Sequence, residues 1–303
     1  MLLRRLYQYQ KERFPILVHG VLIAAFSFSA IGYSRQLRHA SGFIPMSQYL
    51  LCVLTNLSVF FLLRVADEHK DKEDDLKYRP YLPVPRGLVS LKELRVAGFV
   101  LLTIALLANV LWVPAMLVLL LITLGYLLLM RYEFFIPAWL RRHMGWYMLS
   151  HMFIIPLADI YASGYDWKLA GASPKPGLLF FFGVSYCNGI VLEIGRKLRA
   201  PEDEETGVET YTRLWGLKTA TCLWLLVLSI NCALSLAAVY YAGSGTVVPL
   251  LLVFYALSIL PGALFLRRPG RKLSKIVEAV SLLWALAMYL SIGGIPQLLN
   301  LFR

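Results

Sequence analysis

The sequence predicts an all-α protein that crosses a lipid bilayer many times. Hydrophobic residues make up 58% of the 303 residues and charged residues only 16%, whereas a soluble domain has about 25% charged residues. The apolar residues are gathered into runs long enough to cross the bilayer core. Lys and Arg are unevenly divided between alternate connections of these runs. We therefore expect a polytopic membrane protein with one domain over residues 1–303.

Nine apolar runs have spanning or near-spanning length, and we expect nine transmembrane helices around a central cavity. In chain order the runs cover residues 14–33, 46–63, 94–112, 113–130, 144–162, 177–192, 214–242, 247–266 and 276–299. Pro114 stands where the third run meets the fourth, and proline suits the first turn of a helix. These two runs should form a tight hairpin. The basic and aromatic segment 1–13 precedes the first run and is typical of an interfacial anchor.

The basic residues predict the orientation in the membrane. With the N-terminus in the cytoplasm, 25 of the 30 Lys and Arg fall on the cytoplasmic side, which is the bias of membrane proteins. This bias accounts for the net charge of +12. Binding of nucleic acid is not expected, because no soluble basic domain is available to carry it.

The acidic residues are concentrated in two loops, after the second and the sixth run. These loops contain 13 of the 18 Asp and Glu, and four helices between them place both on the cytoplasmic side. If the second helix continues into the first loop, Asp67, Asp71 and Asp75 stack along one helical face. Stacked carboxylates repel one another unless a cation lies among them. Mg²⁺ suits such oxygen ligands, takes one or two protein carboxylates and binds phosphate oxygens as well.

Cations accompany the carboxylates in both loops. Lys77, Arg79 and Arg86 follow the first acidic face and could neutralise phosphate charge, Arg with a bidentate fork. In the second loop, Arg196 and Lys197 lie three and four residues after Glu193, which places all three on one face of a helix that Pro201 should end. The pattern favours a two-part site for a metal and a diphosphate. The alternative is a solvated mixed-charge loop and an ion-pair patch that caps the sixth helix.

Nine segments with carboxylate-rich loops after the second and sixth resemble the UbiA superfamily of intramembrane prenyltransferases. The resemblance covers most of the chain. Its most specific parts are Asp67-Glu-His-Lys-Asp71, Arg79-Pro80, Pro85-Arg86-Gly87, Val89-Ser90 and Gly207-Val-Glu-Thr.

The first motif of that family has Asn or Asp, then Asp four residues on and again four further. Asp67, Asp71 and Asp75 fit with Asp67 in the Asn place. A second register puts Asp67 and Asp71 in the two Asp places and Leu63 in the Asn place. The second motif departs from the family, which usually has two Asp separated by three residues. Here Glu193 is followed by Arg196, Lys197 and Arg199 before Asp203, so Arg196 and Lys197 would take over part of a metal's role.

The resemblance implies a Mg²⁺-dependent enzyme that ionises an allylic prenyl diphosphate in the bilayer and transfers the prenyl group to an unidentified acceptor. The implied catalytic residues are Asp67, Asp71 and Glu193. The implied metal ligands are Asp67, Asp71, Asp75, Glu193 and Asp203, and the implied diphosphate-binding residues are Lys77, Arg79, Arg86, Arg196 and Lys197. Two alternatives remain, a UbiA-type terpene cyclase, favoured by the altered second motif, and a non-enzymatic lipid-binding or transport protein.

The four cysteines are not expected to take part in chemistry. Cys52, Cys187, Cys222 and Cys232 lie within apolar runs and lack the spacing of a metal site, so we expect buried thiols.

Overall fold

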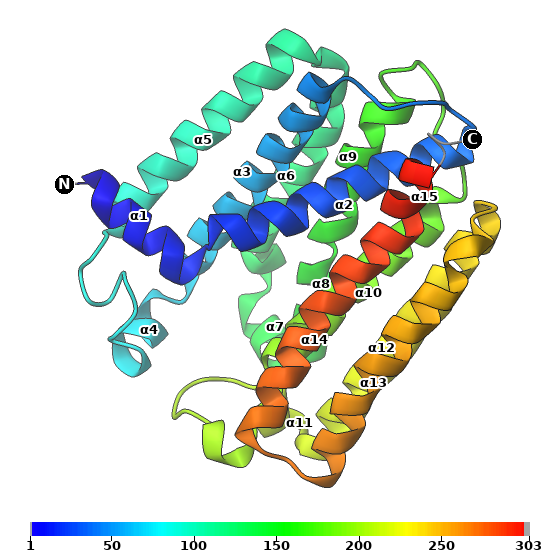
Figure 1. Cartoon of the computed structure of the whole chain (residues 1–303). Coiled ribbons are helices and arrows are strands. Elements are labelled where there is room, and N and C mark those ends of the chain that lie inside the picture. The colour runs from blue at the N-terminus through cyan, green and yellow to red at the C-terminus, as the bar shows by residue number, and fades with distance from the viewer. Residues whose placement is uncertain (1, 300–303) are drawn as a thin grey trace.

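The computed structural model describes residues 2–299, and its regular elements there are all helical (Figure 1). Eight helices in this range are long and apolar enough to cross a membrane. They are α2 (Ile16–Leu37), α3 (Met46–Lys70), α5 (Leu91–Trp112), α6 (Leu117–Arg131, preceded by the 3-10 turn Pro114–Met116), α10 (Leu178–Arg196), α12 (Leu217–Tyr241), α13 (Val248–Arg267) and α14 (Arg271–Tyr289).

The ninth predicted segment, residues 144–162, is built from two shorter helices. Helix α8 (Met144–Met152) ends at Phe153, and α9 (Ile154–Trp167) begins directly after it. Pro156 lies in the first turn of α9 and has no N–H to donate to the Met152 carbonyl, so an unbroken helix cannot form here. Nine helices of full spanning length are therefore not found in residues 2–299. Helices α8 and α9 together nevertheless have the length of one spanning helix.

Shorter elements connect the long helices. They are α1 (Leu2–Arg13), α4 (Lys72–Tyr78), α7 (Pro137–Arg142), α11 (Tyr211–Trp215), the π-helical turn Leu290–Gly294 and α15 (Ile295–Leu299). Pro114 opens the turn between α5 and α6, as predicted. Helix α3 continues past the apolar run to Lys70, which confirms that Asp67 is helical. Helix α10 ends at Arg196, ahead of the predicted break at Pro201.

Helix α10 lies at the centre of the bundle and α5 and α13 at its edge. In α10, 67% of the apolar stretch is buried, against 22% in α5 and α13. Helix α10 packs against α2, α9, α12 and α14, whereas α5 packs mainly on α3 and α13 on α12 and α14 (Figure 1). The ends of α3 and α10 that lead into the acidic loops lie at one end of the bundle.

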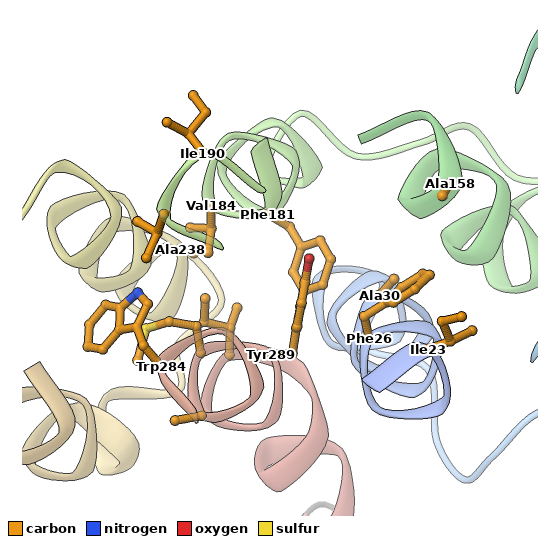
Figure 2. Packing of buried hydrophobic residues seen from close by; sticks show 14 of the residues in the cluster. Ile23, Phe26, Ala30, Ala158, Phe181, Val184, Ile190, Ala238, Trp284 and Tyr289 are labelled. Atoms are coloured by element: carbon orange, nitrogen blue, oxygen red, sulfur yellow. The ribbon is translucent and has the colours of Figure 1, made fainter. Parts of the chain in front are cut away.

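Aromatic side chains fill the middle of the bundle. Tyr289 of α14 lies between Phe26 of α2 and Phe181 of α10 (Figure 2), with ring centroids 5.9 Å from each. The Trp224 indole of α12 donates to the Val191 carbonyl and to the Ser281 hydroxyl, both at 3.1 Å. These contacts hold α10 between α2, α12 and α14 and so fix the position of its charged end.

Close approach between α10 and α14 depends on a glycine next to that charged end. A Cβ on Gly195 would lie 2.1 Å from the Ser281 hydroxyl oxygen, which is far inside van der Waals contact. Gly195 therefore allows α14 to pack directly beside the turn that carries Glu193 and Arg196.

Three of the four cysteines are buried, as predicted. The prediction was wrong for Cys222, which is exposed on the first turns of α12. An apolar position in a membrane helix can face lipid as well as the core, and the sequence did not separate the two cases.

Candidate functional site

The three aspartates of the first loop keep their helical spacing although the helix changes at Asp71. This residue ends α3 and begins α4. The Asp71 N–H donates to the Asp67 carbonyl and the Asp75 N–H to the Asp71 carbonyl, both at 2.8 Å. The i, i+4, i+8 relation predicted for Asp67, Asp71 and Asp75 is therefore confirmed at the level of the backbone.

The carboxylates of these aspartates have different surroundings. Asp75 is buried and forms ion pairs with Arg79 and, at 3.8 Å, with Arg13. Burial raises the pKa of Asp75, against the lowering effect of the Arg79 guanidinium. Within residues 2–299, Asp67 and Asp71 form no ion pair, and they repel each other electrostatically. Asp67 and Asp71 are thus the carboxylates of this face that remain available to a ligand.

The end of α10 carries a carboxylate shared by two cations. Arg196 contacts Glu193 Oε2 at 2.5 Å and Lys197 contacts Oε1 at 3.0 Å, which confirms that the three lie on one face. The side chain of Glu193 is 7% exposed and that of Arg196 is 57% exposed. Arg196 also interacts electrostatically with Asp67. Arg196 therefore links the two predicted halves of the site electrostatically, and the group on α10 has one positive charge in excess.

Tyr211 supports Glu193 from the far end of the second loop. Its hydroxyl donates to Glu193 Oε1 at 3.4 Å. Burial, followed by the nearby Glu193 charge, raises the pKa of Tyr211, so the phenol stays neutral and acts as a donor. Thr210 caps α11 by accepting from the Arg213 N–H at 3.1 Å, and its hydroxyl donates to Glu204. The end of the Gly207-Val-Glu-Thr run thereby sets where Tyr211 lies.

Asp203 is not brought to Asp67 and Asp71. It forms an ion pair with Arg271 at 3.1 Å and accepts a hydrogen bond from Ser274 at 3.3 Å. These contacts fasten the second loop to the start of α14. The sequence could not reveal this, because Arg271 and Ser274 lie two helices further along the chain.

The three cations predicted from the first loop have partners of their own. Arg79 pairs with Asp75, and Arg86 pairs with Glu12 of α1 at 2.7 Å. The Lys77 ammonium lies 4.7 Å from the centre of the Tyr78 ring. Of the five predicted diphosphate-binding cations, Arg196 interacts electrostatically with Asp67, and Lys197 shares Glu193 with Arg196.

Helix α1 is fastened onto the first loop, a contact that the sequence did not predict. Glu68 is buried and accepts hydrogen bonds from Tyr9 at 3.3 Å, Arg13 at 2.8 Å and Arg64 at 2.6 Å. The Arg5 guanidinium pairs with Glu93 at 2.6 Å. The segment 1–13 is therefore more than an anchor, because it neutralises Glu68 and leaves Asp67 and Asp71 as the free carboxylates beside it.

The two acidic loops touch each other. The Tyr81 hydroxyl donates to Glu205 at 3.2 Å. Gly207 has a φ of +76° and lies under the Tyr78 ring, where a Cβ would come within 2.2 Å of a ring atom. A left-handed backbone and the absence of a side chain are both needed at Gly207, so this glycine permits the contact between the loops.

A third part of the chain, from the turn at Glu133 to α8, reaches the same region. Glu133 forms an ion pair with Lys70 at 2.8 Å, and Tyr147 interacts electrostatically with Asp67 and Asp71. Neither residue was predicted from the sequence, because both lie far along the chain from the two acidic loops and share no motif with them.

The carboxylates available here fit a single Mg²⁺ better than a large metal cluster. Within residues 2–299 no group of three or more His, Cys, Asp or Glu side chains is arranged to hold a metal. Asp67 and Asp71 form a pair of carboxylates without cationic partners, and Mg²⁺ commonly takes two protein carboxylates and completes its shell with water and phosphate oxygens. These two residues would hold the metal.

The sequence matches the UbiA prenyltransferase family over residues 21–291. The fold is similar to a solved structure of digeranylgeranylglyceryl phosphate synthase, with a TM-score of 0.61 and 17% identity over 97% of this chain and 99% of that one. It is also similar to the apo structure of a UbiA homologue from Aeropyrum pernix K1, with a TM-score of 0.65 and 17% identity over 90% of this chain and 96% of that one. No curated protein matches the sequence.

Proposed function

We propose that this chain, which belongs to the UbiA prenyltransferase family, ionises an allylic prenyl diphosphate with Mg²⁺ and transfers the prenyl group to an acceptor. The observation that carries the proposal is the pair Asp67 and Asp71, free of ion pairs and beside the cationic end of α10. Two free carboxylates next to a cation in excess suit a ligand that brings both a divalent metal and phosphate oxygens.

Each residue has a separate part in the proposed reaction. Asp67 and Asp71 would hold Mg²⁺, which neutralises charge on the diphosphate as the bond to carbon breaks. Arg196 is largely exposed and would bind phosphate oxygens together with Lys197. Glu193, held by Tyr211, keeps these two cations in place. Their attraction to pyrophosphate grows as negative charge develops on it, and this lowers the barrier.

The reaction breaks the bond between the first prenyl carbon and the bridging oxygen, and the electron pair leaves with pyrophosphate. An electron pair of the acceptor then forms the new bond to that carbon, and the acceptor loses a proton. In a cyclase, a double bond of the same prenyl chain would supply the electron pair instead, and the cyclic cation so formed would lose a proton or add water and then lose a proton. One observation favours the cyclase as the second candidate function. The usual second motif is replaced here by Glu193, Arg196 and Lys197.

The prenyl chain fits the membrane setting. It is as apolar as the lipid that surrounds α5 and α13, whereas its diphosphate is charged and belongs at the water boundary. A substrate with these two ends matches a bundle whose free carboxylates and cations lie at one end of its helices. A digeranylgeranylglyceryl phosphate synthase shares this fold, which supports prenyl transfer in general but does not identify the acceptor.

The experiment is an assay of pyrophosphate release by the protein purified into lipid nanodiscs. Geranyl, farnesyl and geranylgeranyl diphosphate are each supplied with MgCl₂, with and without a total lipid extract as the source of acceptors. Release that requires the extract is expected and supports the transferase. Release of equal rate without extract, together with a cyclic hydrocarbon or alcohol, supports the cyclase. No release with any of the three diphosphates overturns the proposal and leaves a lipid-binding or transport protein.

A further inference from the structure

Lys70, the last residue of α3, is held in place by two other segments. Its ammonium group lies 2.8 Å from Glu133 Oε1 and 4.1 Å from the centre of the Tyr147 ring, and it also donates to the Tyr147 hydroxyl. The Lys70 side chain is 24% exposed, whereas that of Glu133 is 6% exposed. One face of the ammonium is therefore occupied by protein, while part of the side chain remains accessible.

The backbone that brings Glu133 to Lys70 is unusual. Glu133, Phe134 and Phe135 have φ values of +48°, +53° and +62°. Three consecutive non-glycine residues in the left-handed region are unfavourable, and such conformations persist only where surrounding contacts enforce them. The enforced turn places a carboxylate at the end of α3, where it orients a lysine that follows Asp67 and precedes Asp71.

Tyr147 is fixed in the same way. The His151 ring stacks on the Tyr147 ring at a centroid distance of 3.9 Å, and His151 Nδ1 contacts the Tyr147 carbonyl at 2.8 Å. The Lys70 ammonium thus lies between the buried Glu133 carboxylate and the Tyr147 phenol, which His151 holds in place. Both Lys70 and Tyr147 interact electrostatically with Asp67, and Tyr147 also with Asp71, so the group belongs to the same charged region as the free carboxylates.

We propose that Lys70 is a further diphosphate-binding residue and that Glu133 and Tyr147 are positioning residues for it. The inference rests on the proposed function. When substrate is bound, the Lys70 ammonium donates to a phosphate oxygen, and Glu133 and Tyr147 prevent it from bridging directly to Asp67 or Asp71. The diphosphate is then held by cations from two helices, Lys70 from α3 and Arg196 with Lys197 from α10.

The competing explanation is that Lys70 serves only to neutralise Glu133. Single substitution of Lys70 does not separate the two explanations, because it leaves a buried carboxylate without its partner and can unfold the protein. Removing both charges avoids this difficulty, since a buried ion pair replaced by neutral groups is often tolerated. The informative variants are therefore Glu133→Gln, which keeps the cation, and Lys70→Met combined with Glu133→Gln, which removes it.

The test measures the affinity of nanodisc-embedded protein for geranyl diphosphate at fixed MgCl₂, with inorganic pyrophosphate as competitor, and the melting temperature of each variant. Glu133→Gln should bind a few-fold more weakly than the wild type, because the Lys70 ammonium is kept but loses its ion pair with Glu133, and this variant is the reference for the double variant. The double variant should melt near Glu133→Gln but bind geranyl diphosphate and pyrophosphate about tenfold or more weakly, as expected for the loss of one charged hydrogen bond. Lys70→Arg with Glu133→Gln should restore much of the affinity. Lys72→Met, a neighbouring exposed lysine, is the matched control and should bind as the wild type does.

Equal affinity of the double variant and Glu133→Gln overturns the role of Lys70 while the proposed function stands. Absence of binding by the wild type overturns the proposed function and the role of Lys70 together.

Discussion

Asp67 and Asp71 differ from Glu68 and Asp75 beside them in forming no ion pair among residues 2–299, although Arg64, Arg196 and Lys70 act on Asp67 electrostatically. Glu68 is neutralised by Arg13 and Arg64, and Asp75 by Arg79. A carboxylate that already has a buried cation is a poor ligand for a second one, because the exchange would leave the first cation uncompensated. The ion pairs of the first loop therefore select which of its acids can bind a metal.

Asp67→Asn and Asp71→Asn should each lower the turnover of prenyl diphosphate by about a hundredfold or more, the size found when one group that stabilises transition-state charge is removed. Folding should be affected little, since the amide is isosteric and replaces a carboxylate that has no ion pair. The measurement is pyrophosphate release together with the melting temperature. Asp74→Asn is the control, because Asp74 is exposed in the same loop. Turnover near that of the control in both variants would remove the metal pair from the mechanism.

Arg196→Gln and Lys197→Gln should weaken binding of prenyl diphosphate by about tenfold each, because each loses a charged hydrogen bond to a phosphate oxygen. Glu209→Gln, in the same loop but exposed, should bind like the wild type. Glu202→Gln and Glu204→Gln should lower the melting temperature and leave affinity nearly unchanged, since Glu202 accepts from the Arg271 N–H and Glu204 from Thr210.

The comparison is made at one fixed concentration of MgCl₂. If Glu202→Gln or Glu204→Gln weakens binding as much as Arg196→Gln does, the cations of α10 are not the main contacts to the diphosphate, and the second loop binds chiefly through metal-bound carboxylates.

The spatial relations that were predicted correctly from the sequence are local ones. Asp67 and Asp71, and Glu193 with Arg196 and Lys197, lie within one or two turns of a helix, so the 3.6-residue repeat decides which face they share. Asp203 and Arg86 were placed in the site because they lie near it in sequence. Their partners, Arg271 and Glu12, come from distant segments, and no periodicity reports such contacts.

At the scale of elements, the contact between the acidic loops depends on Gly207. Gly207→Ala should weaken diphosphate binding several-fold, because the added methyl group would collide with the Tyr78 ring and separate the loops. Gly243→Ala is a matched control, since Gly243 also has a left-handed φ, of +68°, but nothing within 4 Å of its Cβ position. In both variants the left-handed backbone of an alanine costs about 1–2 kcal/mol of folding free energy. Only a difference in affinity or hydrogen exchange between the two variants therefore reports the contact between the loops.

The readouts for this pair are affinity for geranyl diphosphate and hydrogen exchange of residues 78–90. Faster exchange there in Gly207→Ala alone is the expected result. Identical affinities in the two alanine variants would show that the loops bind substrate independently of each other.

The extent of the long helices was predictable from hydropathy, but their irregularities were not. The continuation of α3 from residue 63 to Lys70 was predicted from the spacing of Asp67, Asp71 and Asp75 and not from hydropathy, because polar residues can continue a helix beyond the membrane boundary. The division of residues 144–167 at Phe153 follows from Pro156. Burial within the bundle was not predictable for α5 or α10, since both are apolar and only packing determines which faces lipid.

At the scale of the whole molecule, the charge bias predicts that both acidic loops face the cytoplasm. Single cysteines at Lys72→Cys and Glu209→Cys should be labelled by a membrane-impermeant thiol reagent in inside-out vesicles and not in intact cells. Lys175→Cys, between α9 and α10, should show the opposite pattern. All three positions are exposed. The background is Cys222→Ser, because Cys222 is the one exposed cysteine among the four. Labelling of Lys72→Cys and Glu209→Cys from opposite sides would exclude a site shared between the two loops.

The packing of the π-helical turn Leu290–Gly294 against α2 has a consequence for biogenesis. A Cβ on Gly293 would lie 2.0 Å from the Ser29 carbonyl oxygen, and Gln36 donates to the Gly293 carbonyl at 3.3 Å. Helix α2 therefore completes this packing only after residues 290–294 have been synthesised. At about 5–20 residues per second, synthesis of the intervening chain leaves the buried Gln36 side chain of α2 without its Gly293 partner for on the order of tens of seconds. Until then α2 must pack transiently against an insertase or a neighbouring helix. Proteins truncated just before residue 290 should therefore be degraded by membrane quality-control proteases, even though every preceding span has been inserted.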